Sequence, residues 1–173
     1  MNQVDIWFQD EARVGQRGTV SRVWAPRGTR PRLQRQQQFE YAYVFGAICP
    51  AQKQAAGIVM PYANTQAMQL HLKEISNHVP LNRHAVIIMD KAAWHTTKKL
   101  DSPNNISLLF LPPVSPELNP VEQVWNWLRQ HEWSNRVFKN FDDIVEVCSE
   151  TWNAFTQLPD LIASIGHRQW ATL

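Results

Sequence analysis

The chain has few cysteines and no long apolar run, and both features narrow its class. Its two cysteines, Cys49 and Cys148, lie in apolar segments at no metal-ligand spacing, so we interpret them as reduced core residues of a cytoplasmic protein. No apolar run reaches the length that spans a bilayer, and the amino terminus lacks the pattern of a signal peptide. With 173 residues, 44% of them hydrophobic, the chain can bury a sizeable core of single-domain size.

Several common motifs are missing as well. The sequence contains no glycine-rich phosphate loop, no zinc spacing of cysteine and histidine, and no serine-hydrolase elbow.

The most informative stretch runs from Leu111 to Trp125. An apolar segment ends there in a proline-punctuated loop, and a helix follows for which Asn119 suits the N-cap and Pro120 the first helical position. Glu122 then falls in the first turn, where free backbone N–H groups favour a negative charge. One interpretation is a variant capping box, in which Glu122 reaches back to the backbone of Asn119. The other is that Glu122 takes part in catalysis.

Two further acids occupy comparable positions. Asp10 follows a β-prone segment that begins at Val4, and Asp90 follows the apolar segment 85–89. Three widely separated acids at strand ends or helix starts are what a metal-dependent phosphoryl-transfer site needs.

The segments that carry these acids resemble the DDE transposases of the mariner superfamily, in particular the bacterial insertion-sequence branch. Asp10-Glu11 matches the first motif of that family, and Asp90-Lys91-Ala92-Ala93-Trp94-His95 matches the second. The third and most specific match is Ser115-Pro116-Glu117-Leu118-Asn119-Pro120-Val121-Glu122. The resemblance covers about residues 4–155.

The resemblance implies an α/β protein with a ribonuclease H-like fold, a mixed five-stranded sheet flanked by helices. In that fold Asp10 and Asp90 would lie together at the carboxyl edge of the sheet, with Glu122 laid over them by its helix. The resemblance makes these three acids both the catalytic residues and the metal ligands. Their oxygens suit Mg²⁺ or Mn²⁺, and two such ions can activate a nucleophile and stabilise the leaving oxygen of a phosphate.

The function implied is that of a transposase catalytic domain, a Mg²⁺-dependent DDE endonuclease. Such a domain cleaves DNA at transposon ends and transfers the strands into target DNA. The alternative is a catalytically degenerate remnant that binds DNA, or a full-length partner, without cleavage. The resemblance also suggests a homodimer and a bacterial, nucleoid-associated location.

Acidic residues are absent from residues 12–38. This region holds seven of the 17 basic residues, all arginines, which favours phosphate contact over a merely solvated hairpin. A strand is expected at 19–24, with Trp24 packed beneath it or stacked on a base. The expected DNA-binding residues are Arg13, Arg17, Arg22, Arg27, Arg30, Lys91 and His95.

Two departures from the family matter. Lys91 stands where the family usually has asparagine, so its ammonium either contacts the scissile phosphate or weakens metal binding and marks a degenerate copy. The chain also begins almost at the first expected catalytic strand. We therefore expect residues 1–173 to form one ribonuclease H-like catalytic domain without the family's amino-terminal helix-turn-helix region. A catalytic fragment, half of a split reading frame and a truncated element all fit.

His95 keeps the family's histidine position, and a packed or capping role is the alternative for it.

The hydrophobic pattern predicts strands first, then alternating helices and strands, then helices. Strands are expected at 4–10, 39–49, about 55–60, 85–89 and 106–111, and helices at 64–78, 92–100, 120–132, 141–156 and 158–171. This order predicts a mixed sheet with helices on its faces.

Overall fold

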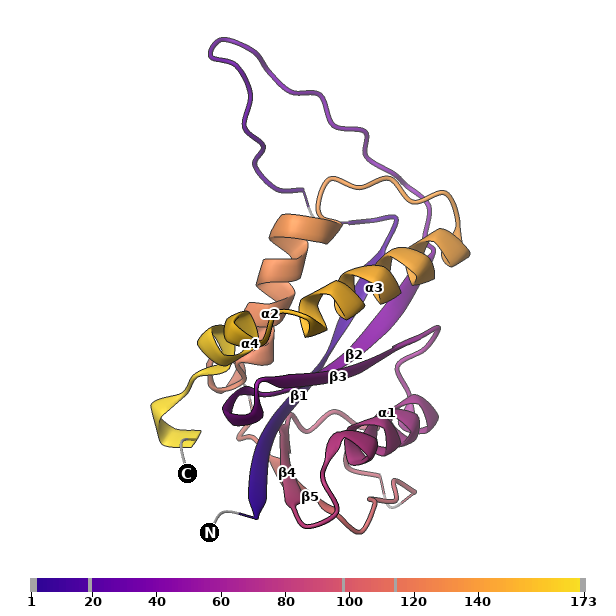
Figure 1. Ribbon diagram of the computed structural model, residues 1–173. Helices are drawn as coiled ribbons and strands as arrows, with labels where there is room; N and C mark the ends of the chain where they lie inside the picture. The colour runs from indigo at the N-terminus through magenta and orange to yellow at the C-terminus, as the bar shows by residue number, and fades with distance from the viewer. Residues whose placement is uncertain (1–2, 19, 98, 114, 172–173) are drawn as a thin grey trace.

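The computed structural model of the protein describes residues 3–18, 20–97, 99–113 and 115–171 (Figure 1). Within these residues, one mixed sheet of five strands has the order β3-β2-β1-β4-β5. The strands are β1 (Val4–Gly15), β2 (Tyr41–Cys49), β3 (Gln54–Met60), β4 (His84–Met89) and β5 (Ile106–Phe110). β1, β2 and β3 are antiparallel neighbours, whereas β4 lies parallel to β1 and β5 parallel to β4. The predicted fold class is confirmed.

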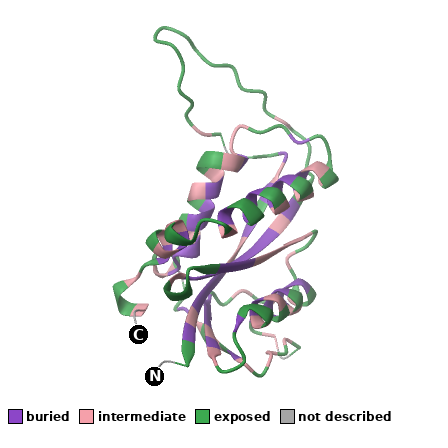
Figure 2. Ribbon diagram, in the orientation of Figure 1, coloured by how far each residue is buried: buried purple, intermediate pink, exposed green. Residues whose placement is uncertain are grey.

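Helices cover both faces of this sheet. They are α1 (Thr65–His78), α2 (Val121–Leu128), α3 (Phe141–Thr156) and α4 (Pro159–Gly166). Because side chains alternate along a strand, Trp7 joins the core under α1, and Phe8 joins the core under the other three helices. The buried residues follow the strands and the inner helix faces (Figure 2). None of the described helices combines the length and hydrophobicity needed to cross a membrane.

The region between β1 and β2 differs most from its prediction. Its described residues, 16–18 and 20–40, are here called the arginine loop; Thr19 lies outside the described residues. Residues 20–24 form no strand, so that prediction is wrong, and Trp24 is fully exposed instead of packed. The loop projects away from the sheet (Figure 1), where water can satisfy its backbone groups and no sheet partner is required.

The predicted helix at 92–100 is also wrong. Its described residues form turns, and Lys98 lies outside the described residues. The turn closes locally, because the Ala92 N–H donates to the Asp90 carboxylate and the His95 N–H donates to the Ala92 carbonyl. The chain therefore folds around Asp90 and brings His95 back to it.

The remaining elements match their predictions with altered ends. β1 runs on to Gly15 because β2 pairs with it as far as that residue. The helix expected at 120–132 ends at Leu128 and continues as a π-helical turn, Arg129–Trp133. The last helical stretch divides into α4 and a 3-10 turn at Gln169–Ala171. Cys49 and Cys148 are buried and unpaired, as predicted.

Two glycines let large aromatic rings lie directly on the sheet. Gly46 pairs with Asp10 across β1 and β2, and Gly57 pairs with Gly46 across β2 and β3. A Cβ atom at Gly46 would lie 2.5 Å from ring atoms of both Trp125 and Trp152, whose ring centroids are 5.7 Å apart. The absence of a side chain on Gly46 therefore gives Trp125 the room to reach Asp10.

Replacing Gly46 by alanine is expected to destabilise the protein by about 1–3 kcal/mol, because the added methyl group forces two packed tryptophans to move. Urea denaturation measures this change. Gly18→Ala is the matched control, since its Cβ would meet only the Gly15 carbonyl oxygen, at 3.4 Å, and should change stability by less than about 0.5 kcal/mol. Equal stability of Gly46→Ala and the wild type would contradict the packing described above.

Candidate active site

A cleft of about 360 Å³ lies where the end of β4 meets the start of α2. Asp10, Asp90 and Glu122 all line it. Asp10 comes from β1, Asp90 directly follows the last residue of β4, and Glu122 lies in the first turn of α2. The structure thus brings together the three acids that the sequence motifs indicated.

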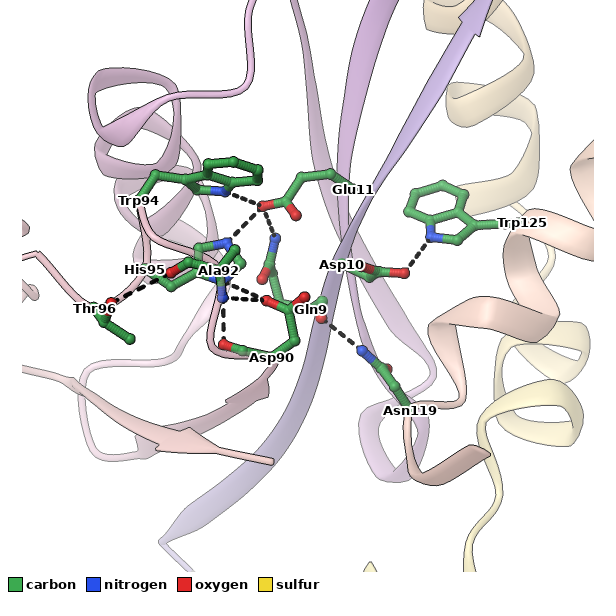
Figure 3. Close-up of polar contacts among 10 residues, drawn as sticks. All are labelled: Gln9, Asp10, Glu11, Asp90, Ala92, Trp94, His95, Thr96, Asn119 and Trp125. Carbon is green, nitrogen blue, oxygen red and sulfur yellow. Dashed lines mark hydrogen bonds and ion pairs between the residues drawn. The ribbon is translucent and has the colours of Figure 1, made fainter. Parts of the chain in front are cut away.

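Asp10 lies on the face of β1 that packs against α2. Its Oδ2 accepts a hydrogen bond of 2.9 Å from the indole Nε1 of Trp125 (Figure 3). Burial raises the pKa of Asp10 to about 7, and the negative charges of Glu11 and Glu122 add to the increase, while the bond from Trp125 opposes it. Without a cation, this carboxyl is therefore only partly ionised at neutral pH.

Glu11, the next residue, points to the opposite face of β1 (Figure 3). Its Oε1 accepts hydrogen bonds from Gln9 Nε2 at 3.0 Å, Trp94 Nε1 at 3.4 Å and His95 Nε2 at 2.8 Å. The other ring nitrogen of His95, Nδ1, lies 2.8 Å from Asp90 Oδ1. A chain from Glu11 through His95 to Asp90 therefore connects β1 to the second acid of the cleft.

His95 is only 2% exposed. Burial of the ring opposes its protonation, but the hydrogen bond to Glu11 and the charges of Glu11 and Asp90 raise the pKa of His95 above its ordinary value. A protonated ring can donate to one carboxylate from each nitrogen. The burial of the ring fits the packed alternative for His95, and its contact with DNA stays a prediction.

Asn119 organises the start of α2. Its Oδ1 accepts the N–H of Val121 at 3.1 Å, and its Nδ2 donates to the Gln9 carbonyl at 2.8 Å. The N-cap position itself is Pro120, one residue later than predicted. The N–H of Asn119 donates to the Pro116 carbonyl, so it is already satisfied without the reciprocal bond that a capping box would require from Glu122. The side chain of Glu122 instead lines the cleft.

A divalent cation fits the donor set of this cleft, although the side chains are not gathered around one point. In the part of the chain that the structure describes, no three His, Cys, Asp or Glu side chains are close enough to hold a metal ion. Asp10 is turned toward Trp125 and Asp90 toward His95. The three carboxylates nevertheless offer only oxygen ligands. Burial is the main cause of the raised pKa of Asp10, and a cation would relieve the smaller part that comes from the negative charges of Glu11 and Glu122.

The other predicted contact residues are spread over two regions. Lys91 is exposed, lines the same cleft and forms no ion pair within the described residues. The exposed residues Arg22, Arg27 and Arg30 belong to the arginine loop. Arg13, on β1, and Arg17, in the arginine loop, line a different cleft.

Two contributions to the site were not predicted. In the sequence, Trp125 falls on the apolar face of its expected helix, and no pattern shows that its indole N–H reaches an acid. The position of Glu11 next to Asp10 in the sequence indicates a supporting or a surface residue, and it does not show that the Glu11 carboxylate is the common acceptor for three side chains. The alternation of a strand was the available signal for Glu11, since it places neighbouring residues on opposite faces.

Residues 5–145 match the family described as DDE superfamily endonuclease. The chain belongs to this family. The protein named "Uncharacterized protein y4pE/y4sA" of Sinorhizobium fredii (strain NBRC 101917 / NGR234) is 54% identical over 131 residues, which cover 76% of this chain and 97% of that protein.

Solved structures of the Mos1 mariner transposase have a similar fold. The Mos1 catalytic domain aligns with a TM-score of 0.57 and 14% identity, over 95% of this chain and 83% of that one. The Mos1 mariner paired end complex with Mn aligns with a TM-score of 0.63 and 14% identity, over 95% and 56% respectively. This DDE family member therefore spans just over half of the Mos1 chain in that complex, and the likeness establishes the ribonuclease H-like fold.

In metal-free buffer, the protein is expected to lose stability as the pH rises from about 4 to about 7. The pKa of Asp10 is raised from 3.8 to about 7 by folding. The folded state therefore holds this proton more tightly, and the stability present below the unfolded pKa is lost as the pH rises through the folded pKa. The titration of Asp10 alone should lower the free energy of unfolding by about 3–4 kcal/mol over this pH range.

Urea denaturation in EDTA at a series of pH values measures this loss. Asp10→Asn is the matched variant, because it cannot titrate but keeps an oxygen acceptor for Trp125. The stability of the variant should vary much less with pH over this range than that of the wild type. Parallel pH profiles for the two proteins would show that Asp10 does not carry the raised pKa.

Proposed function

We propose that this protein is a transposase catalytic domain that cleaves DNA at transposon ends and transfers the strands into target DNA, using divalent metal ions. The observation that carries the proposal is the single cleft lined by Asp10, Asp90 and Glu122 in a member of the DDE endonuclease family. The fold shared with the Mos1 transposase, and the Mn in the Mos1 paired end complex, support it.

In the proposed reaction the three acids act as metal ligands. Asp10, Asp90 and Glu122 would hold Mg²⁺ or Mn²⁺, two ions in all. When bound, such ions activate a water or a 3′-hydroxyl group and stabilise the leaving oxygen of the phosphodiester. The role of the fold is to position the ligands: β1 carries Asp10, the turn after β4 carries Asp90, and the first turn of α2 carries Glu122.

Glu11 and His95 are proposed as positioning residues. The His95 ring is held between Glu11 Oε1 and Asp90 Oδ1, at 2.8 Å from each. Since the Asp90 side chain is exposed at the cleft, this buried ring fixes one of its oxygens from behind. Such a carboxylate–histidine–carboxylate chain limits the orientations of the ligand, as outer-shell partners of metal sites do.

Lys91 lies in the same cleft but is exposed. Its flexible stem lets the ammonium group extend into solvent, or toward a phosphate that enters the cleft. We therefore propose that Lys91 contacts DNA near the cleaved bond. The degenerate alternative requires instead that the charge of Lys91 suppress metal binding. Metal-dependent nicking of DNA by the wild type would exclude that alternative.

Asp10→Asn, Asp90→Asn and Glu122→Gln should each abolish Mg²⁺- or Mn²⁺-dependent nicking of supercoiled plasmid and leave the fold intact. Each change removes an anionic oxygen ligand and preserves the side-chain shape. The loss should exceed the roughly 10–100-fold that removal of an outer-shell partner costs. Gel electrophoresis follows the nicking, and circular dichroism checks the fold.

Glu117→Gln is the matched control, since Glu117 is exposed and lies in the same motif without lining the cleft. Nicking by Glu122→Gln at the wild-type rate would return Glu122 to a role in the helix terminus. A wild-type protein that binds DNA but nicks it with neither metal would favour the degenerate remnant.

His95→Gln is expected to slow nicking by about 10–100-fold and to raise the Mg²⁺ concentration needed for half-maximal rate. The cause is the lost orientation of Asp90. Glu11→Gln should retain more activity, because its amide oxygen can still accept the bond from His95 Nε2. His78→Gln is the control, since His78 is exposed on α1. An unchanged Mg²⁺ requirement in His95→Gln would limit His95 to a structural role.

A further inference from the structure

The cleft lined by Asp10, Asp90 and Glu122 is called the catalytic cleft here. A second cleft, of about 770 Å³, lies at the other end of α2. We call it the basic cleft, and its main lining residues are Arg13, Arg17, Phe39, Tyr41, Asn126 and Arg129. It is larger than the catalytic cleft, which measures about 360 Å³. Among the described residues, β4 pairs with β1 only as far as Phe8, so the rest of this edge of β1 lacks a strand neighbour.

Three arginines line the basic cleft, and no acidic residue is among its lining residues. Arg13 comes from β1, Arg17 from the arginine loop and Arg129 from the first position of the π-helical turn. Within the described residues, none of the three forms an ion pair with a carboxylate. Guanidinium groups gathered in a concave site without counter-charges attract anions, and their planar donors match phosphate oxygens.

Aromatic rings hold two of these guanidinium groups in place. Arg13 Cζ lies 4.9 Å from the centroid of the Tyr41 ring, and Arg17 Cζ lies 3.8 Å from that of Phe39. Phe39 is 67% exposed, so it contributes a ring at the surface rather than a core contact. A guanidinium held over a ring face has its flat side occupied and its N–H groups directed outward in its plane, where a phosphate can accept them.

The basic cleft and the catalytic cleft share one helix. Glu122 lines the catalytic cleft, while Asn126 and Arg129, four and seven residues later, line the basic cleft. At a rise of 1.5 Å per residue, the backbones of Glu122 and Arg129 are separated by about 10 Å along the helix. Phosphates of one DNA strand advance about 3.4 Å each along the duplex axis, so a single strand can span this distance within a few nucleotides.

We propose that the basic cleft binds the phosphodiester backbone of DNA within a few nucleotides of the phosphate that is cleaved in the catalytic cleft. This inference rests on the proposed function and extends it to a defined surface. It assigns DNA contact to Arg129 and Asn126, which no sequence motif indicated. It also ranks the arginines, because Arg13 and Arg17 line the cleft and the exposed Arg22, Arg27 and Arg30 do not.

The test compares two triple variants that lose the same charge. In the cleft variant Arg13, Arg17 and Arg129 become glutamine, and in the loop variant Arg22, Arg27 and Arg30 do. Fluorescence anisotropy measures binding to a labelled DNA duplex at several salt concentrations, in EDTA so that nothing is cleaved. Three lost phosphate contacts should make the negative slope of log K against log salt shallower by about 2.7. The loss of affinity between 50 and 200 mM salt would then be about 40-fold smaller than for the wild type.

The cleft variant is expected to show this shallower slope. In the loop variant the slope should change by less than about 0.9, which is the contribution of about one phosphate contact. A third variant with lysine at the three cleft positions keeps the charges and should keep most of the slope, which separates lost contacts from a damaged fold. A loop variant whose slope falls as much as that of the cleft variant, or an unchanged slope in the cleft variant, would overturn the inference.

Failure of the proposed function has a different signature in the same experiment. If the wild type itself does not bind the duplex at low salt, then the proposed DNA-cleaving role fails together with the cleft. If the wild type binds and nicks DNA while the cleft variant has the wild-type slope, the proposed function stands and the position of the DNA is wrong.

Discussion

The candidate active site depends on the alternation of side chains along β1. Asp10 and Glu11 are adjacent, so one must face α2 and the other the turn that follows β4. Trp125 meets Asp10 on the first side, and His95 meets Glu11 on the second. A shift of one residue in the pairing of β1 with its neighbours would exchange these partners and turn the apolar residues of both cores around. The register of the sheet therefore determines the geometry of the site.

Trp125 contributes both to the packing of the core and to the electrostatics of the candidate site. Its ring stacks on Trp133, with centroids 6.1 Å apart, and lies against Gly46, the residue that pairs with Asp10. The same indole that fills this core donates its N–H to the Asp10 carboxylate. That bond favours the ionised carboxylate, whereas the apolar surroundings favour the neutral acid, and the raised pKa of Asp10 shows that burial dominates. The large aromatic content of the chain thus acts on the chemistry as well as on the core.

The sequence predicted the fold well where patterns are local. The helix at 141–156 was predicted with its observed ends, because Asn140 caps it and its apolar residues recur at helical spacing. The predictions for 19–24 and 92–100 failed where local patterns did not decide the structure. The described residues 20–24 are mostly exposed to solvent, and the turn after Asp90 combines local hydrogen bonds with the distant contact between His95 and Glu11. The bond from Trp125 to Asp10 spans 115 positions, and Arg129 enters its cleft only through the packing of α2 beside β1. Periodicity carries no information about such pairs.

The two clefts together address the repulsion between the carboxylates of the candidate site and the phosphates of DNA. Three carboxylates repel a phosphodiester, and at 4 Å one pair of like charges costs about 4 kcal/mol near a protein surface. Cations in the catalytic cleft would cancel that repulsion at the cleaved phosphate, but they do not anchor the flanking DNA. Arg13, Arg17 and Arg129 line the other cleft, where their attraction to neighbouring phosphates would add to DNA binding without disturbing the proposed metal ligands. Because the shared helix is rigid, DNA held in the basic cleft would present a phosphate to Glu122 at a nearly fixed distance. In the proposed arrangement, separating attraction from chemistry would let a chain with a net charge of only +2 bind a polyanion beside its own acids.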